Sequence, residues 1–177
     1  MYLLVIMSGD TLMNKPIISK YSELVQYIIA KVAARPNFGK TLLWKILYFS
    51  DFNFYELHYK SITSEVYRKI EHGPAPCNID LIIKKLIKSK KIKKENGEFF
   101  GRGQERYLAL EDPILKELSA EEIKVVDKAI DLIGSMTARA ASEYSHNDIP
   151  WKATANKDII DYELVFHRTP LTSAQED

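Results

Sequence analysis

The 177-residue sequence contains a single cysteine, Cys77, so an internal disulfide is excluded. This usage is typical of proteins that fold in a reducing compartment, and we expect a cytoplasmic protein. Three motifs of common enzymes are also missing from the sequence: the CxxC pair, the HExxH pair and the GxSxG turn. We therefore expect no enzymatic activity, no metal site and no cofactor.

The side chains that could still carry chemistry are scattered along the sequence. They are Asp51, His58, His72, Cys77, Ser145, His146 and His167. A nucleophile pair of Cys77 with His72 or His146 stays open, because the sequence alone does not place these residues in space. A single cysteine beside prolines is more often a small buried residue, so a small hydrolase is a lesser alternative.

Neither sign of charge dominates: 25 lysines and arginines stand against 24 aspartates and glutamates, for a net charge of +1. Such a chain is not a strong polyelectrolyte, and we expect weak or no binding to nucleic acid. No apolar run is long enough to cross a bilayer, so we expect no membrane span.

The length and the apolar content suit one compact domain. The apolar stretch at residues 1–7 lacks the positive start and the length of a secretory signal. We interpret residues 1–12 as a leader outside the domain, with a short strand on a sheet edge as the alternative. Residues 13–168 are expected to form the domain, and residues 169–177 a polar tail.

Residues 42–55 predict the central helix, because they are apolar on nearly every side. A helix of this kind is stable only when protein surrounds it. Asp51 lies within it, and a buried carboxylate must be paired or hydrogen-bonded. We expect Asp51 to be a satisfied packing residue, buried close to Tyr48 and His72.

The rest of the pattern predicts a predominantly α-helical α+β fold, with helices around this central one. Ser22 is a candidate cap for a helix at residues 23–34. Asn78 is a candidate cap for an amphipathic helix that reaches residue 89. Ser119 and Glu122 form a capping box that opens a helix ending at residue 133. Residues 138–144 predict a short helix of small residues.

Two short β segments are expected between these helices. Residues 66–70 favour a strand, and the two prolines in residues 72–76 favour a turn after it. Asn96 and Gly97 are a strong signal for a two-residue hairpin turn, with a returning strand at residues 106–110.

The order helix, strand, helix, hairpin is that of a winged helix. A basic cluster at residues 84–94, with Arg102 and Arg106, would lie on its second helix and its hairpin. Such a cluster is typical of nucleic-acid binding, but also of a lysine-protected edge strand. We favour a solvated helix face with a protected edge strand, or a protein-binding role, because the net charge is near zero and the rest of the chain is rich in acidic residues. In a protein interface, exposed aromatic residues and arginines contribute most of the energy. The predicted contact residues are Phe99, Phe100, Arg102 and Arg106.

Residues 34–41 have the spacing of a degenerate phosphate-binding loop that ends in Gly39, Lys40 and Thr41. A true loop of this kind follows a buried strand, whereas this one follows a predicted helix. We therefore predict a helix–helix connection that binds no nucleotide, with Thr41 capping the central helix.

Two separated motifs stand out: the first runs from ILYFSDF through SIT to a tyrosine followed by HGPAP, and the second is YSHNDIPW. Together they resemble the Panacea domain of SocA-like antitoxins, a family that includes phage-associated GepA-like proteins. Lys60 departs from the pattern, since the family commonly has glycine there. The motif residues are Tyr48, Asp51, Ile62, Thr63, Tyr67, His72, Gly73, Pro74, Ser145, His146, Pro150 and Trp151.

The resemblance, which spans residues 27–166, implies an antitoxin of a toxin–antitoxin system. Such a protein neutralises a cognate toxin by direct contact, and in the SocA-like branch it can deliver the toxin to a protease. In this interpretation His72 and His146 hydrogen-bond loop backbone or Asp51 and hold the two motifs together. The alternative from the residues alone is a winged-helix DNA-binding regulator.

Overall fold

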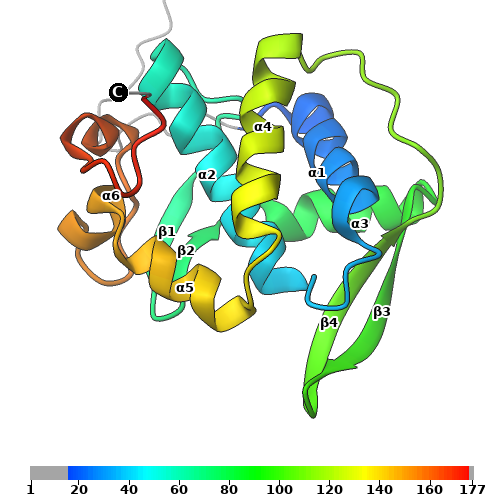
Figure 1. Cartoon of the computed structure of the whole chain (residues 1–177). Helices are drawn as coiled ribbons and strands as arrows, with labels where there is room; N and C mark the ends of the chain where they lie inside the picture. The colour runs from blue at the N-terminus through cyan, green and yellow to red at the C-terminus, as the bar shows by residue number, and fades with distance from the viewer. Residues whose placement is uncertain (1–15, 176–177) are drawn as a thin grey trace, which may run out of the picture.

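A computed structural model describes residues 16–175 of the chain (Figure 1). Within them, seven helical segments and four short strands form a helix-dominated α+β fold, which confirms the predicted fold class. The expected leader, residues 1–12, lies outside the described residues. No helix within residues 16–175 combines the length and the apolarity that crossing a membrane requires.

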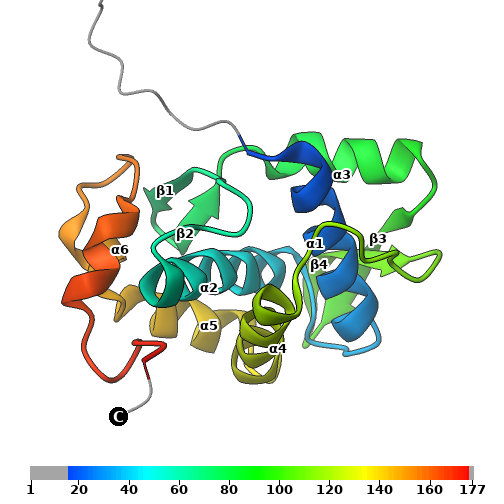
Figure 2. The same cartoon turned by 90° about the horizontal axis from the view of Figure 1, so that it is seen from above.

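Helix α2 (Lys40–His58) is the centre of the fold and confirms the predicted central helix. It contacts α4 (Ala120–Ile133), α5 (Ala138–His146) and the 3-10 helix η1 (Tyr162–His167). Figure 2 shows α2 in the middle of the molecule, with α4 and α5 on one side of it. Protein surrounds α2 on most sides, as its nearly unbroken apolar surface requires.

Helix α1 (Ile18–Val32) packs on α2 and on α3 (Ile79–Lys88). It begins five residues before the predicted start at residue 23, so Ser22 is not its cap. Instead the Ser22 hydroxyl donates to the carbonyl oxygen of Ile18 at 2.6 Å, inside the helix. The fully buried Tyr21 extends the apolar face of α1 toward its N-terminus, and this burial outweighs the local capping signal.

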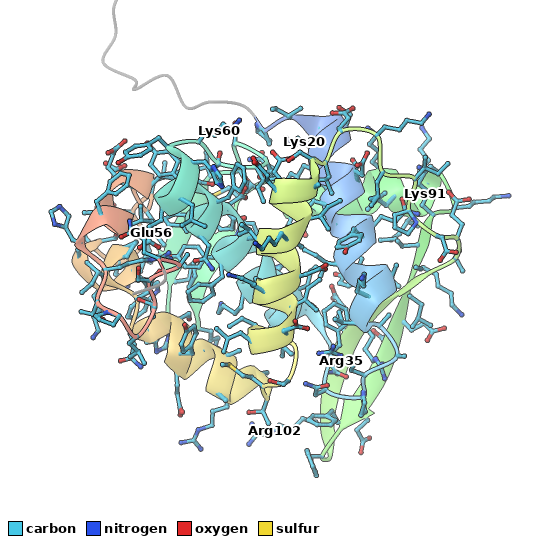
Figure 3. The ribbon with its side chains drawn as sticks, turned by 45° about the horizontal axis from the view of Figure 1, so that its top comes forward. Lys20, Arg35, Glu56, Lys60, Lys91 and Arg102 are labelled. Carbon is cyan, nitrogen blue, oxygen red and sulfur yellow. The ribbon has the colours of Figure 1, made fainter. Side chains whose placement is uncertain are left out.

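The predicted capping box at the start of α4 is confirmed. The amide of Ser119 donates to Glu122 Oε2 at 2.8 Å, and the amide of Glu122 donates to the Ser119 hydroxyl at 3.2 Å. Glu122 also forms an ion pair with Lys20 of α1, which is labelled in Figure 3. One carboxylate therefore both caps α4 and ties it to α1.

Strands β1 (Tyr67–Ile70) and β2 (Gly73–Pro76) form an antiparallel hairpin, so the predicted turn at residues 72–76 is wrong. The turn is made by residues 71 and 72 instead. Pro74 and Pro76 fit within β2 because the outer edge of β2 pairs with no other strand among residues 16–175, so no amide donor is needed there. Asn78 precedes α3 as predicted, but its side chain donates to Glu65 rather than capping the helix.

Strands β3 (Ile92–Phe99) and β4 (Arg102–Ala109) form the second hairpin, which projects from the body of the protein (Figure 1). Its turn is Phe100-Gly101, not the predicted Asn96-Gly97, which lies inside β3. Ile92 and Tyr107 are buried at the base of the hairpin. Their burial fixes the strand register and so moves the turn outward.

Candidate functional site

Asp51 is fully buried and satisfied, as predicted. It accepts hydrogen bonds from the amides of Ile62 and Thr63, both at 2.9 Å, and from the hydroxyls of Thr63 and Tyr67, both at 2.7 Å. Burial raises the pKa of Asp51 to about 6, against the opposing effect of these donors. The first motif thus folds around one carboxylate, which fixes the segment after α2 and the start of β1.

Of the two predicted companions of Asp51, Tyr48 lies nearby, because its ring packs edge-on against Tyr67 with centroids 5.4 Å apart, but His72 does not. Tyr48 is buried, but its hydroxyl donates to Asp148 at 2.7 Å. His72 is exposed, which contradicts its predicted burial. The reason is the β1–β2 hairpin, because its two-residue turn places His72 at the tip, away from α2.

Arg168 is the centre of a second buried network, which the sequence did not reveal. Its Nε and Nη2 donate to the two carboxylate oxygens of Asp148, each at 2.8 Å. Its Nη1 donates to Asn53 and to Glu56, both at 2.9 Å. These contacts join the residue after η1 to α2 and to the start of α6 (Ile149–Ala153). The one available signal was Glu56, a carboxylate on a largely apolar helix, which requires a partner.

Residues of the expected polar tail complete this network. The Ser173 hydroxyl donates to Glu56 at 2.6 Å, and the Ala174 amide donates to the same carboxylate at 2.9 Å. Thr172 is buried. The carboxylate of Glu56, labelled in Figure 3, therefore holds the chain to residue 174 against α2.

The two motifs meet at His146. Its ring stacks on Trp151 with centroids 4.2 Å apart and lies near the backbone of Glu71, while its Nε2 is buried without a hydrogen-bond partner among residues 16–175. Burial and the nearby Lys45 lower the pKa of His146. This agrees with the predicted contact between His146 and loop backbone, which joins α5 to the β1–β2 turn.

Lys45 and Ser145 lie beside Gly73, all of them buried. The ammonium of Lys45 donates to the carbonyl of Pro74 at 3.1 Å, and burial lowers its pKa to about 7. A Cβ at Gly73 would lie 2.4 Å from the Ser145 oxygen and 2.7 Å from Lys45 Cε, so only glycine fits. The Ser145 hydroxyl donates to the carbonyl of Ser142 at 2.7 Å. Ser145 therefore has a packing role, because its side chain is fully buried and its hydroxyl is not accessible to a substrate.

Cys77 is exposed just after β2. Partial burial of the thiol raises its pKa. Among residues 16–175, no group of three His, Cys, Asp or Glu side chains is arranged to hold a metal ion. His58 stacks on Phe54 at the end of α2, and His167 ends η1.

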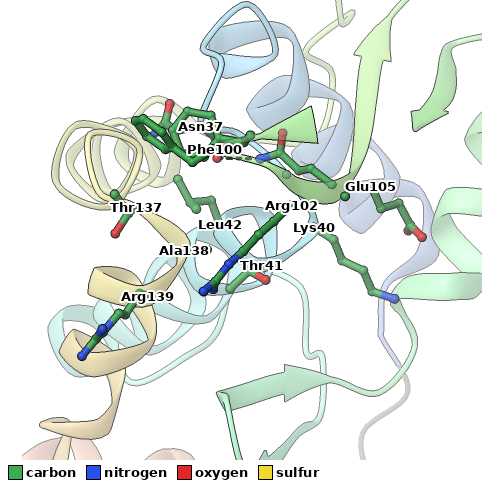
Figure 4. Close-up of a pocket in the computed structure, with 14 residues that line it drawn as sticks. Asn37, Lys40, Thr41, Leu42, Phe100, Arg102, Glu105, Thr137, Ala138 and Arg139 are labelled. Atoms are coloured by element: carbon green, nitrogen blue, oxygen red, sulfur yellow. Dashed lines mark hydrogen bonds between the residues drawn. The ribbon is translucent and has the colours of Figure 1, made fainter. Parts of the chain in front are cut away.

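A pocket of about 570 Å³ opens between the β3–β4 hairpin and the N-termini of α2 and α5 (Figure 4). Three of the four predicted contact residues line it: Phe99, Phe100 and Arg102. Arg106 does not. It donates instead to the carbonyls of Ala33 and Arg35, at 2.8 and 3.1 Å, and anchors the hairpin to the end of α1.

The segment with phosphate-loop spacing also borders this pocket. It follows α1, a helix, as predicted, and not a strand. Gly39, and not the predicted Thr41, is the cap residue of α2, and it offers no side-chain acceptor. The absence of nucleotide binding at this segment stays a prediction.

The hairpin lysines are largely neutralised. Lys93 lies 2.5 Å from a carboxylate oxygen of Glu95, and Lys94 lies 2.7 Å from Glu105. The lysines on the outer face of α3 are exposed: Lys84, Lys85 and Lys88. The basic cluster of the sequence is therefore split into a compensated hairpin and a charged helix face.

Taken together, these features define a small helical domain in which two buried polar networks hold the fold and a projecting hairpin borders an open pocket. The chain belongs to the family described as antitoxin SocA-like, Panacea domain, which matches residues 43–152. This confirms the predicted resemblance. Searches of the curated proteins and of the solved structures gave no match.

Proposed function

We propose that this protein is an antitoxin that neutralises a cognate toxin by direct protein–protein contact. The observation that carries the proposal is the family match over residues 43–152. An antitoxin of this kind acts in the cytoplasm beside its toxin. Its action needs a rigid scaffold and an accessible surface, and both features occur in this chain.

The scaffold comes from the motif residues. The carboxylates of Asp51 and Asp148 are buried, and neighbouring donors occupy them. Polar groups that are fully paired inside the protein rigidify it and are not free to react. We therefore assign the motifs to the scaffold and seek the contact surface elsewhere.

Accessible aromatic and arginine side chains gather at the hairpin tip. Phe100 is 86% exposed, and Arg102 is exposed beside it. Side chains of these types contribute most of the binding energy in protein interfaces. The hairpin tip is thus the surface that we assign to the toxin.

Co-expression with the product of the neighbouring gene tests the proposal. We expect growth arrest caused by that product to be relieved, and the two proteins to co-purify. Persistent toxicity with both proteins folded and expressed would contradict neutralisation. Loss of relief in Cys77→Ala or His146→Ala with an intact complex would instead indicate catalysis.

We further propose that the complex delivers the toxin to a protease, as the SocA-like branch implies. The test measures the half-life of the toxin with an ATP-dependent protease, in the presence and absence of this protein. Faster degradation of the toxin only in its presence supports the adaptor role. An unchanged half-life limits the function to neutralisation by contact.

A further inference from the structure

We propose that the pocket between the hairpin tip and the N-termini of α2 and α5 binds an acidic peptide segment of the toxin, with one apolar side chain against Phe99 and Phe100. The inference rests on the proposed antitoxin function and adds the site and the chemistry of the partner segment. Four features of the pocket support it.

The first feature is the turn residue Phe100. Its φ is 50° and that of Gly101 is 72°, so both turn residues are left-handed. Asn-Gly suits such a turn, whereas a bulky aromatic residue is strained there. The ring is nevertheless 86% exposed and lies edge-on to Phe99, with centroids 4.5 Å apart. Most of the ring is therefore free to contact a partner.

The second feature is the charge of the lining. Lys40, Arg102 and Arg139 line the pocket, with Glu105 as the one carboxylate among its lining residues. Glu105 is already paired with Lys94. Arg102 has no hydrogen bond or ion pair with any residue in 16–175, and Figure 4 shows it reaching across Thr41. Arg139 is paired with Glu143 on α5, and the ammonium of Lys40 lies over the ring of Trp44. Arg102 and Lys40 therefore supply the positive charge that no carboxylate pairs, and an acidic segment complements it.

The third feature is the pair of helix N-termini. Neither α2 nor α5 has an acidic residue in its first turn. The cap residue Gly39 gives the α2 amides no side-chain acceptor. At α5 the Thr137 hydroxyl accepts the amide of Ala140 at 3.1 Å, so uncapped amides are found only at α2. These amides and the two helix dipoles add to the positive potential of the pocket.

The fourth feature selects a peptide over nucleic acid. The pocket has apolar surface from Phe99, Phe100 and Ala138, and its volume is that of a site for a compact ligand group. A duplex would instead need a row of free cations along the hairpin. There Lys93 and Lys94 are paired with carboxylates.

The probe is a fluorescein-labelled peptide of glutamates with one leucine, tested by anisotropy against the full chain. Matched peptides replace each glutamate with serine or with lysine, and a random-sequence DNA duplex is the competitor. We expect the acidic peptide to bind tightest. Amide chemical shifts should change at the lining residues. Equal affinity for the serine and acidic peptides would overturn the charge argument, and stronger binding of the duplex to the same residues would overturn the peptide assignment.

Two variants weaken this binding if the site is right. The double variant Arg102→Glu with Arg139→Glu should lose affinity about tenfold or more, because it reverses two charges at the pocket. Phe100→Asn should lose about tenfold, because it removes an exposed aromatic contact. Asn is favourable in the turn, so a folding defect would not explain the loss.

Two control variants repeat these changes away from the pocket. Lys84→Glu with Lys88→Glu makes the same charge change on α3. Tyr59→Asn removes another exposed aromatic residue with positive φ, at the opposite end of α2. Both controls should bind the peptide as the wild type does, and an equal loss in the controls would overturn the assignment of the site.

The same variants with the toxin separate the two proposals. If the wild type binds the toxin and the pocket variants bind equally well, the pocket inference fails and the antitoxin function stands. If the wild type binds no toxin, the proposed function fails. The pocket is then judged by the peptide alone, and acidic-peptide binding lost in the pocket variants still supports its chemistry.

Discussion

The two ends of α2 differ in the burial of the charged residues around them. At its C-terminal half, Asp51 and Glu56 are buried together with the side chain of Arg168, which follows η1, and neighbouring groups engage all three. At its N-terminus, Arg102 and Phe100 are exposed beside an open pocket. The first arrangement fixes the fold, and the second leaves charge and apolar surface available.

This difference shows that the residues most recognisable in the sequence are not those we assign to the partner. The motifs are recognisable because Asp51 and Gly73 have narrow structural requirements, namely several donors around one carboxylate and space for no Cβ. A contact surface has broader requirements, since different aromatic or basic residues can serve it. Substitutions at the C-terminal end of α2 should therefore lower mainly stability, and substitutions at its N-terminal end should lower mainly partner binding. The two effects should also differ in size.

The largest effect is expected for Arg168→Met. It leaves the buried carboxylates of Asp148 and Glu56 without their cation, and breaking such a network typically costs about 3–5 kcal/mol. Urea unfolding of the full chain measures the loss. Arg139→Met is the matched control, since its pair with Glu143 is exposed and should contribute nothing measurable. Equal stability of the two variants would show that the Arg168 network does not hold the fold.

A second effect of similar size concerns pH and Asp51. Its pKa is raised from 3.8 to about 6 in the folded protein. Between these values the folded state binds more protons than the unfolded state, so stability is greater at low pH and falls as the pH rises to about 6. A shift of about two units corresponds to about 3 kcal/mol.

The Asp51→Asn variant isolates this contribution, because it removes the titration while other groups stay the same. The stability of the wild type relative to the variant should fall as the pH rises from 3.8 to 6, measured by urea unfolding at each pH. An increase over that window would mean that the four donors outweigh burial and lower the pKa instead.

The parts of the fold that the sequence predicted depend on local patterns. The apolar run of α2 and the Ser119–Glu122 capping box are visible within a few turns of chain, and the structure contains both. The hairpin turn was placed wrongly because Asn96-Gly97 is a local signal. The register is set by burial of Ile92 and Tyr107 against distant helices.

The candidate site was predictable only in part for the same reason. Residues such as Phe99 and Arg102 were chosen by their type, and the structure places both at the pocket. Arg168 was missed because its partner Glu56 lies 112 residues away, beyond any local period. The predicted burial of His72 failed because strand β2 includes two prolines that locally favour a turn.

A smaller effect, opposite in sign to that of Arg168→Met, is expected for Phe100→Asn. Relieving the strained backbone at a φ of 50° should stabilise the protein by about 1 kcal/mol. The same change should weaken toxin binding, so stability and function should move in opposite directions. Thermal unfolding and affinity are measured on one preparation. A destabilised variant would show that the Phe100 ring supports the hairpin, and would remove the argument that it is kept for a partner.

The smallest effect concerns nucleic acid and separates α3 from the hairpin. We expect weak duplex binding at low salt that is lost at physiological salt, because it comes from phosphate contacts alone. Lys84→Glu with Lys88→Glu should abolish it, since these lysines are exposed on α3. Lys93→Glu with Lys94→Glu should reduce it less, since these lysines are already paired with carboxylates. Anisotropy of a labelled duplex at two salt concentrations measures both. Sequence-specific binding that survives physiological salt and depends on the hairpin pair would instead favour a winged-helix regulator.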